Sequence, residues 1–478
     1  MIDTQKLRQR ILDLAIRGKL VPQDPNDEPA SVLLEKIRAE KERLIAEGKI
    51  KRPKAKKTSD KSHYEDFQPP FDIPDSWEWV TLNDVGEIIT GNTPAKDVED
   101  YYGGDIPFYK PTDLSQGINT QCSSDTLTPQ GFELSRKLPV DSILITCIGA
   151  TIGKTGLIKR AGSCNQQINA IIPNKGIIPE YVYYCCNSLY FQNCIKRNAS
   201  STTLPILNKN SFANLSFPLP PTSEQVSIVK AINDFLSIVD AIERSTVELT
   251  TAIGACKSKI LDLAMQGKLV EQYPSDEPAA DMLRRINPKA KIITDNPHYP
   301  QLPSEWCIAA IRDVFEINPK NVAAGDAEAG FVPMASICEG FNNSFVYTRR
   351  KWDEIKTGFT HFANGDIAVA KISPCLENRK SMILRNLPNG IGSGTTELLV
   401  FRSKVVYPEY GLLFFKSDNF IKQCVSTFNG VVGQQRVGKS IVDEILIPIP
   451  PLNMQRTIVH QINEWFDNLD NILVNLSN

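Results

Sequence analysis

The sequence RILDLAIRGKLVPQDPNDEPA at residues 10–30 returns as KILDLAMQGKLVEQYPSDEPA at residues 259–279. A second repeat relates FPLPPTSEQVSIVKAINDFLSIVDAI at 217–242 to IPIPPLNMQRTIVHQINEWFDNLDNI at 447–472. Self-similarity at a long, nearly fixed distance indicates that one structural unit is built twice. The 478-residue chain therefore contains two copies of one fold, in line with a length that is too great for a single core.

The segments between these repeats are much less alike. PDSWEWVTLNDVGEI at 74–88 matches PSEWCIAAIRDVFEI at 303–317, and PEY at 179–181 matches PEY at 408–410. Elsewhere the register drifts and the two middles differ. Constant ends with divergent middles suggest a shared scaffold that carries two different recognition surfaces.

The two chain ends complete the repeat. Asn478 corresponds to position 248 and Met1 to position 250, so the copies tile with a single position unfilled. The chain has the pattern of a closed ring of two units that is opened inside a helix. We expect the N- and C-termini to lie side by side.

A heptad pattern predicts that this helix is long. A spacing of four and three residues is kept by Ile228, Ile232, Phe235, Val239, Ile242, Thr246, Leu249, Ile253, Cys256, Ile260 and Leu263. Such a seam drives two helices to supercoil. Thr222 and Gln225 have the spacing of a capping box at its start, and Gly267 suits the left-handed position after its end.

The second copy of the helix is assembled from both chain ends. Its seam is Ile458, Ile462, Trp465, Leu469, Ile472 and Leu476, and it resumes in phase at Thr4, Leu7, Ile11 and Leu14 before Gly18. A helix of about 45 residues is roughly 65 Å long. We therefore expect an antiparallel two-helix spacer; two ordinary core helices are the alternative.

The two middles have the pattern of mixed α/β domains. SILITCI at 142–148 and DIAVAKI at 366–372 are short β-branched runs between turns, and a helix should begin near Pro179 and near Pro408. Each GKLV is followed by a short helix, near 29–47 and 278–287. Only the first continues into the basic stretch KIKRPKAKK at 49–57, which we interpret as a solvated linker rather than a phosphate-binding arm.

Composition excludes several classes of protein. Net charge is −2, which argues against indiscriminate coating of nucleic acid, although a local basic cleft remains possible. We find no apolar run of about eighteen residues that would span a membrane. The eleven cysteines form no CxxC pair, so we expect reduced thiols in the cytoplasm and no metal site.

The sequence matches none of the catalytic or cofactor-binding motifs that we compared with it. GATIGKT at 149–155 resembles a phosphate-binding loop but has three residues between Gly149 and Gly153 where that loop needs four. The histidines are far apart, and no dinucleotide fingerprint follows a strand. We therefore expect no catalytic centre, no cofactor and no metal.

GKLVPQDPNDEPA, the tryptophan-led domain starts and the PLPPxxxQ helix entries resemble the specificity subunit of type I restriction–modification systems. The resemblance covers nearly the whole chain. It implies two target-recognition domains that read the halves of a split, asymmetric site in double-stranded DNA. It also implies that the conserved helices bind two methyltransferase subunits, joined by restriction subunits. S-adenosylmethionine and ATP are then expected on those partners. Unlike the usual layout, this chain begins with the helix–GKLV segment, a permutation of the same ring.

This resemblance gives the predicted architecture its names. Two α/β target-recognition domains are separated by a long antiparallel two-helix coiled coil, in a pseudo-twofold, circularly permuted repeat. The boundaries are an N-terminal helical segment (1–47), a basic linker (48–75), target-recognition domain 1 (76–221), the central helical spacer (222–302), target-recognition domain 2 (303–451) and a C-terminal helix (452–478).

Base readout needs Asn, Gln, Arg and Lys on variable loops, because these side chains match the hydrogen-bonding edges of adenine and guanine. In the first domain the candidates are Thr93, Lys110, Lys154, Gln166, Gln167, Arg197 and Asn198. In the second they are Lys320, Arg349, Arg350, Lys371, Asn378, Lys380, Gln434 and Arg436. The alternatives are a two-domain protein-binding scaffold with incidental DNA contact, and an enzyme that holds nucleotide at 149–155.

Overall fold

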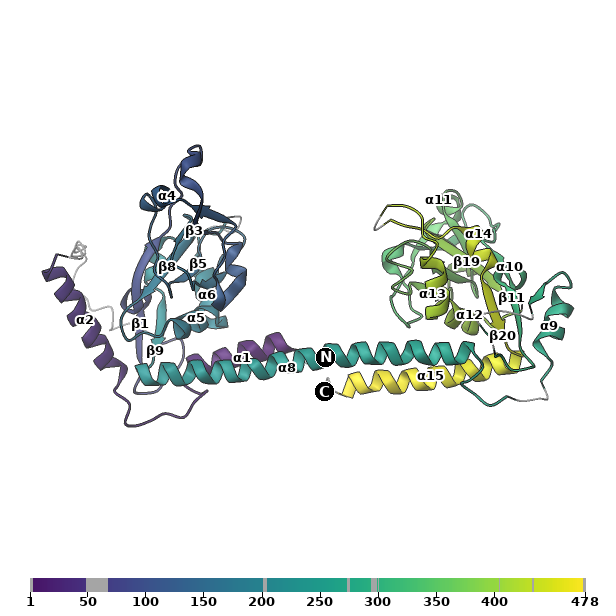
Figure 1. Ribbon diagram of the computed structural model, residues 1–478, viewed down its shortest axis with the longest axis horizontal. Helices are drawn as coiled ribbons and strands as arrows, with labels where there is room; N and C mark the ends of the chain where they lie inside the picture. Colours follow the sequence, from purple (N-terminus) through teal and green to yellow (C-terminus); the bar gives the residue numbers. More distant parts are fainter. Residues whose placement is uncertain are drawn as a thin grey trace. The chain divides into compact units, whose positions relative to one another are not determined.

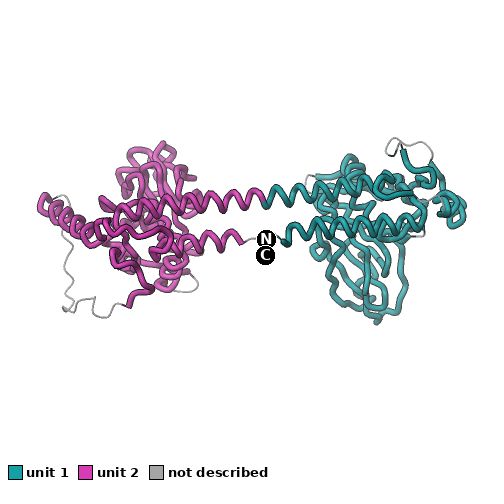
Figure 2. The backbone as a smooth tube through the Cα atoms, turned by 90° about the horizontal axis from the view of Figure 1, so that it is seen from below, with its two compact units in different colours: residues 1–2, 246–478 teal, residues 3–245 magenta. Residues whose placement is uncertain are grey.

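The structure is a computed structural model that describes residues 3–48, 68–200, 204–272, 276–293, 299, 301–403, 405–431 and 434–475. The chain divides into two compact units, residues 3–245 and residues 246–478 with 1–2 (Figure 2).

The unit of residues 3–245 contains the first α/β domain. Its main antiparallel sheet has the order β2 (Gly86–Thr90), β8 (Ile168–Pro173), β5 (Ile143–Thr146) and β6 (Thr155–Leu157). A second sheet has the order β4 (Asp125–Leu127), β3 (Tyr102–Tyr109) and β7 (Ser163–Cys164), and β1 (Glu78–Thr81) pairs with β9 (Ser216–Leu219). The remaining elements are α2 (Ala30–Ala46), α3 (Leu82–Val85), α4 (Pro129–Glu133), α5 (Pro179–Asn187), α6 (Leu189–Asn198), α7 (Lys209–Ala213), η1 (Glu99–Tyr101) and η2 (Asp113–Asn119).

The unit of residues 246–478 repeats this plan. Its main sheet has the order β12 (Phe315–Ile317), β19 (Leu398–Ser403), β16 (Ile367–Ala370) and β17 (Ser381–Ile383). The other sheets are β14 (Thr348–Lys351), β13 (Glu328–Val332), β18 (Ile391–Gly394) and β15 (Thr360–Ala363), and β10 (Ile292–Ile293), β11 (Cys307–Ala310) and β20 (Leu446–Ile449). Its short helices are α9 (Ala279–Ile286), α10 (Ile311–Val314), α11 (Trp352–Ile355), α12 (Pro408–Phe415), α13 (Asp418–Val425), α14 (Lys439–Glu444), η3 (Met334–Ser336) and η4 (Pro388–Gly390). The predicted mixed α/β class is confirmed in both copies, with helices beginning at Pro179 and Pro408.

The long helix α8 spans Thr222–Met265, as its sequence pattern predicts (Figure 1). In the first unit, α1 (Thr4–Ile16) lies antiparallel to it: Arg8 bonds Asp240 and Glu243, while Gln23, beyond α1, reaches back to Glu224. In the second unit, α15 (Leu452–Asn475) is antiparallel to the other half of α8, with an ion pair of 2.6 Å between Lys257 and Asp470. Both chain ends therefore supply helices that pair with α8. None of the described helices is long and apolar enough to cross a membrane.

The predicted seam is only partly correct. Ile228, Ile232 and Ile253 are buried, but Phe235 is 44% exposed and Cys256 is also exposed. In α15 the buried aromatic residue is Phe466, whereas the predicted Trp465 is 38% exposed. The ends of α8 pack on the domain cores as well as on a partner helix, so the covered face coincides with the heptad seam at only some of its positions.

The predicted capping box at the start of α8 is wrong. The Thr222 hydroxyl donates to the Gly176 carbonyl at 2.8 Å. The Gln225 amide donates to the Pro220 carbonyl and accepts from the Ile178 N–H, at 2.9 and 2.8 Å. Both side chains hold the segment before α5 against the helix start, so neither caps the helix.

The glycine of each GKLV has the conformation that the sequence predicts. Gly18 and Gly267 have φ values of +65° and +68°. After α8, Gly267 N–H bonds the Ala264 carbonyl and Lys268 N–H the Leu263 carbonyl, which closes the helix end. The predicted neighbouring termini and the basic stretch at 49–57 lie outside the described residues.

Candidate nucleic-acid interface

The two domains share a backbone frame at one end of their main sheets, although their sequences diverge there. In the first domain Cys147 N–H bonds the Gln167 carbonyl (2.7 Å), and Leu207 N–H bonds the Cys147 carbonyl (2.8 Å). In the second domain Lys371 N–H bonds the Glu397 carbonyl (2.9 Å), and Val437 N–H bonds the Lys371 carbonyl (3.0 Å).

A further pair of backbone bridges completes the frame. Ile206 pairs with Ile148 and Ser200, just as Arg436 pairs with Ile372 and Asn429. Three loops therefore have the same place in each domain: a hairpin loop (147–154 and 371–380), an inter-strand loop (165–167 and 395–397) and a return loop (described at 199–200 and 204–206, and at 426–431 and 434–436). These loops carry most of the predicted residues.

The hairpin loop places a lysine at the same position in both domains. Thr146 N–H bonds the Lys154 carbonyl as Ala370 N–H bonds the Lys380 carbonyl, at 2.9 Å in each case. Lys154 Nζ then donates to the Thr112 carbonyl at 3.1 Å, and Lys380 Nζ to the Met334 carbonyl at 3.4 Å. The two domains therefore present a lysine at equivalent places, although the sequences of their hairpin loops are dissimilar.

The hairpin loop also shows what GATIGKT does. It joins the antiparallel strands β5 and β6, and no helix follows it. Its Gly149, Gly153 and Lys154 N–H groups bond the carbonyls of Pro205, Thr146 and Thr151. A phosphate-binding loop needs such N–H groups free at the start of a helix. The nucleotide interpretation of this stretch therefore has no structural basis.

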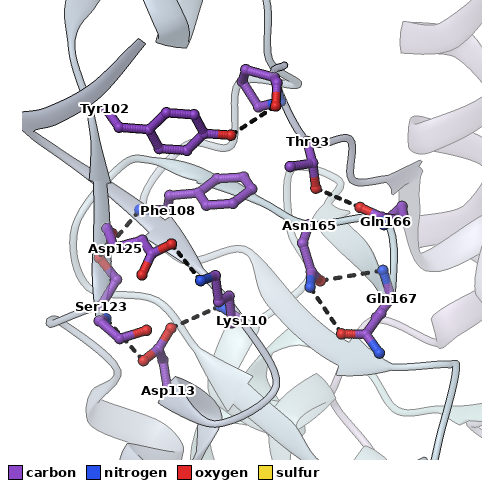
Figure 3. Close-up of polar contacts among 12 residues, drawn as sticks. Thr93, Tyr102, Phe108, Lys110, Asp113, Ser123, Asp125, Asn165, Gln166 and Gln167 are labelled. Atoms are coloured by element: carbon purple, nitrogen blue, oxygen red, sulfur yellow. Dashed lines mark hydrogen bonds and ion pairs between the residues drawn. The ribbon is translucent and has the colours of Figure 1, made fainter. Parts of the chain in front are cut away.

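The first domain has a polar cleft of about 570 Å³ beside the inter-strand loop. Four predicted residues line it: Thr93, Lys110, Gln166 and Gln167. Figure 3 shows Tyr102 and Phe108 on one side of the cleft, with Thr93 and the two glutamines on the other.

Hydrogen bonds fix the side chains of the cleft. Thr93 Oγ1 donates to Gln166 Oε1 at 2.5 Å, and Asn165 Nδ2 donates to Gln167 Oε1 at 3.0 Å. Lys110 Nζ forms an ion pair with Asp125, and burial is the main cause that raises the pKa of Tyr102 nearby. The cleft thus offers amide, hydroxyl and ammonium groups of defined orientation, the types that read base edges and phosphates.

The remaining predicted residues of the first domain, Arg197 and Asn198, end α6 and are exposed. Asn198 Nδ2 donates to the Cys194 carbonyl at 2.9 Å. They directly precede the return loop, whose Pro205 carbonyl bonds Gly149 N–H in the hairpin loop. They therefore adjoin the loop set without lining the cleft.

In the second domain Lys371, Gln434 and Arg436 come together. Arg436 is bound by both oxygens of Glu397, from Nε at 2.9 Å and Nη2 at 3.0 Å, and its Nη1 donates to the Gln434 carbonyl at 2.8 Å. Asn378 and Lys380 meet at Glu339, with distances of 3.3 and 3.6 Å. Lys371 of the first group and Asn378 and Lys380 of the second all belong to the hairpin loop, which therefore joins the two groups.

Three predicted residues of the second domain lie apart from these groups. Arg349 and Arg350 are exposed on the edge strand β14 and pair with Glu328 and Glu354 at 2.8 and 3.8 Å. Lys320 is exposed in the loop after β12, three residues beyond the strand end, as Thr93 is beyond β2.

Sequence reasoning missed residues that the geometry places in the same sites. Asn165, Asp125, Tyr102 and Phe108 line the first cleft, and Glu397 occupies in the second domain the place of Gln167. The run NQQ at 165–167 was a signal for Asn165. Nothing in the local sequence marks Glu397, because its role depends on the distant Arg436.

The two equivalent α/β domains are joined by one long helix. Each presents polar loops on the common backbone frame, and these loops differ between the two domains. The fold therefore defines a protein with two different recognition surfaces. The chain belongs to the family of type I restriction–modification specificity proteins. A family model described as "Type I restriction modification DNA specificity domain" matches residues 74–251 and 303–477.

Curated relatives carry matching names. The EcoAI specificity subunit of Escherichia coli is 41% identical over 231 residues, which cover 45% of this chain and 39% of that protein. The EcoKI specificity subunit of Escherichia coli strain K12 is 21% identical over 85% of both chains. The matches cover 39% and 37% of the lengths of the EcoAI and EcoEI subunits.

The fold has a counterpart among solved structures. A chain from the work titled "Structural basis underlying complex assembly and conformational transition of the type I R-M system" superimposes with a TM-score of 0.57. The alignment covers 84% of this chain and 93% of that one at 16% identity, so it concerns the fold alone.

Proposed function

We propose that this chain is the DNA-specificity subunit of a type I restriction–modification complex and has no catalytic centre of its own. Domain 1 and domain 2 each read one half of a bipartite, asymmetric site in double-stranded DNA. The observation that carries the proposal is the common backbone frame, which holds Gln167 in one domain and Glu397 with Arg436 in the other. A scaffold that is copied while its polar contacts differ suits the reading of two different sequences.

Membership of this family supports a proposal about the partners. Two methyltransferase subunits dock on the helices, restriction subunits join them, and S-adenosylmethionine and ATP bind those partners rather than this chain. Exposed apolar side chains support docking: Phe235 on α8 and its repeat counterpart Trp465 on α15 are 44% and 38% exposed. In the second unit Trp465 also lines an apolar groove of about 390 Å³ between α8 and α15.

A salt titration of the purified chain tests the DNA-reading proposal. Its affinity for random duplex should fall steeply with salt, because each phosphate contact releases bound counterions. A protein-binding scaffold would show almost no such dependence, and a nucleotide enzyme would bind ATP without DNA. The chain freed of partners should neither methylate nor cleave DNA when S-adenosylmethionine and ATP are supplied.

A further inference from the structure

Arg436 stands out among the exposed cations of the second domain because its guanidinium is oriented from two sides. Of its five N–H donors, Nε and one on Nη2 go to the Glu397 carboxylate, and one on Nη1 goes to the Gln434 carbonyl. Two donors remain, one on each terminal nitrogen, with no partner among the residues that the structure describes. The side chain is still 44% exposed.

The backbone under this pair is also fixed. Arg436 exchanges two backbone hydrogen bonds with Asn429, of 2.9 and 3.1 Å, and Lys371 bridges Glu397 to Val437. An arginine on such a support loses little conformational freedom when it binds a ligand. An exposed ion pair contributes little to stability, so folding alone gives a weak reason for this arrangement.

The first domain supplies an internal comparison. At the same places in its frame it has Gln167 and Ile206, with no ion pair between them. The domains therefore share the support but differ in the group that it presents. A difference confined to a conserved support is expected where two domains read different bases.

We propose that Arg436 reads a guanine in the half-site of the second domain, and that Glu397 is the positioning residue that orients its guanidinium. This inference rests on the proposed DNA-reading function. In the major groove guanine presents the acceptors N7 and O6, which accept two N–H groups from one arginine. Adenine presents N7 beside the N6 amino group, so one guanidinium donor would face another donor. The two remaining N–H groups of Arg436 therefore select guanine.

The test uses the full chain assembled with its methyltransferase subunits and a pool of randomised duplexes. Arg436→Lys keeps the charge but removes the planar pair of donors. We expect the preference for guanine to fall by about 5- to 150-fold at one position, with the other half-site unchanged. Glu397→Gln should weaken the preference at the same position to a smaller degree.

The control is Arg285→Lys on α9. Arg285 is also exposed and bound by both oxygens of a carboxylate, Glu277, at 3.2 and 2.8 Å. This variant should leave every position of the selected motif intact.

Two results would overturn the assignment. If both Arg436→Lys and Arg436→Ala leave the motif unchanged, no base is read there, because alanine, unlike lysine, keeps no donor for guanine O6 and N7. If Arg436→Lys lowers affinity for all sequences alike, Arg436 is a phosphate contact or a structural tie. A wild-type complex that selects no sequence at all would instead refute DNA reading itself, so the two failures are distinguishable.

Discussion

Replacing Gly267 with alanine tests why GKLV is kept in both copies. Gly267 ends α8 at φ +68°, and a Cβ atom there would lie 2.5 Å from Pro303 Cδ and 2.6 Å from Pro303 Cγ. Gly18 has the same relation to Pro74, at 2.4 Å from its Cγ. The glycine thus has two functions: it allows the left-handed turn, and it admits the proline that begins the domain.

Gly48 separates these two effects. Its φ is +69°, and a Cβ atom there would meet no atom of the described residues within 4 Å. Gly48→Ala therefore introduces only the left-handed strain, of about 1–2 kcal/mol. Gly267→Ala adds overpacking against Pro303, which typically costs about 1–3 kcal/mol. Any change in the unfolded chain is common to both variants and cancels in the comparison.

Urea unfolding of the full chain, followed by tryptophan emission, measures the difference. We expect Gly267→Ala to lower the free energy of unfolding by about 1–3 kcal/mol more than Gly48→Ala does. Trp306 lies 3.3 Å from the added Cβ atom and should report the change. Equal losses in both variants would refute the close-contact argument and leave the turn as the only reason for the glycine.

Three further predictions concern single side chains. Lys154→Ala should leave nucleotide binding at background and weaken DNA binding by about 1 kcal/mol or less. The prediction is contradicted if the unchanged chain binds ATP stoichiometrically and Lys154→Ala abolishes that binding. Glu224 accepts a hydrogen bond from Trp77 Nε1 at 2.7 Å, and burial raises the pKa of its carboxyl group. The contribution of Glu224 to stability is therefore fully present below the pKa that this group has in the unfolded chain. It is lost as pH rises through the higher pKa that the group has in the folded chain. Glu224→Gln should remove this pH dependence from urea midpoints, and an unchanged slope would be evidence against it. Burial lowers the pKa of Lys416 to about 7, so between pH 7 and 10.5 the unfolded chain binds more protons than the folded chain. The free energy of unfolding should therefore rise in this range, by at most ~1.4 kcal/mol per pH unit. Lys416→Met should flatten that rise in the same urea assay.

The scaffold could be predicted because local chemistry determines it. Pro179 and Pro408 begin α5 and α12, and Gly18 and Gly267 follow the ends of α1 and α8. The repeat shows that each of these signals occurs twice. The seam was less predictable: Phe235 has the apolar character and spacing of a buried residue, but periodicity does not tell which apolar face is covered. Tertiary packing decides that.

The candidate interface was predictable in composition but not in arrangement. Gln166 and Gln167 could be chosen by residue type, and Lys154 and Lys380 likewise. The equivalence of Gln167 with Glu397 could not, because the intervening loops differ in length and the sequence register is lost. It is visible only through backbone hydrogen bonds that join residues far apart in the chain.

The most direct test of whether each domain reads its own half-site is to let the assembled complex select DNA from a pool of randomised duplexes. The wild-type chain should select two defined half-sites separated by an undefined stretch. Replacing Gln166 and Gln167 together with alanine should blur only the half-site that the first domain reads, leaving the other half-site and the spacing unchanged. If both half-sites change, or neither does, the domains do not read DNA as independent units.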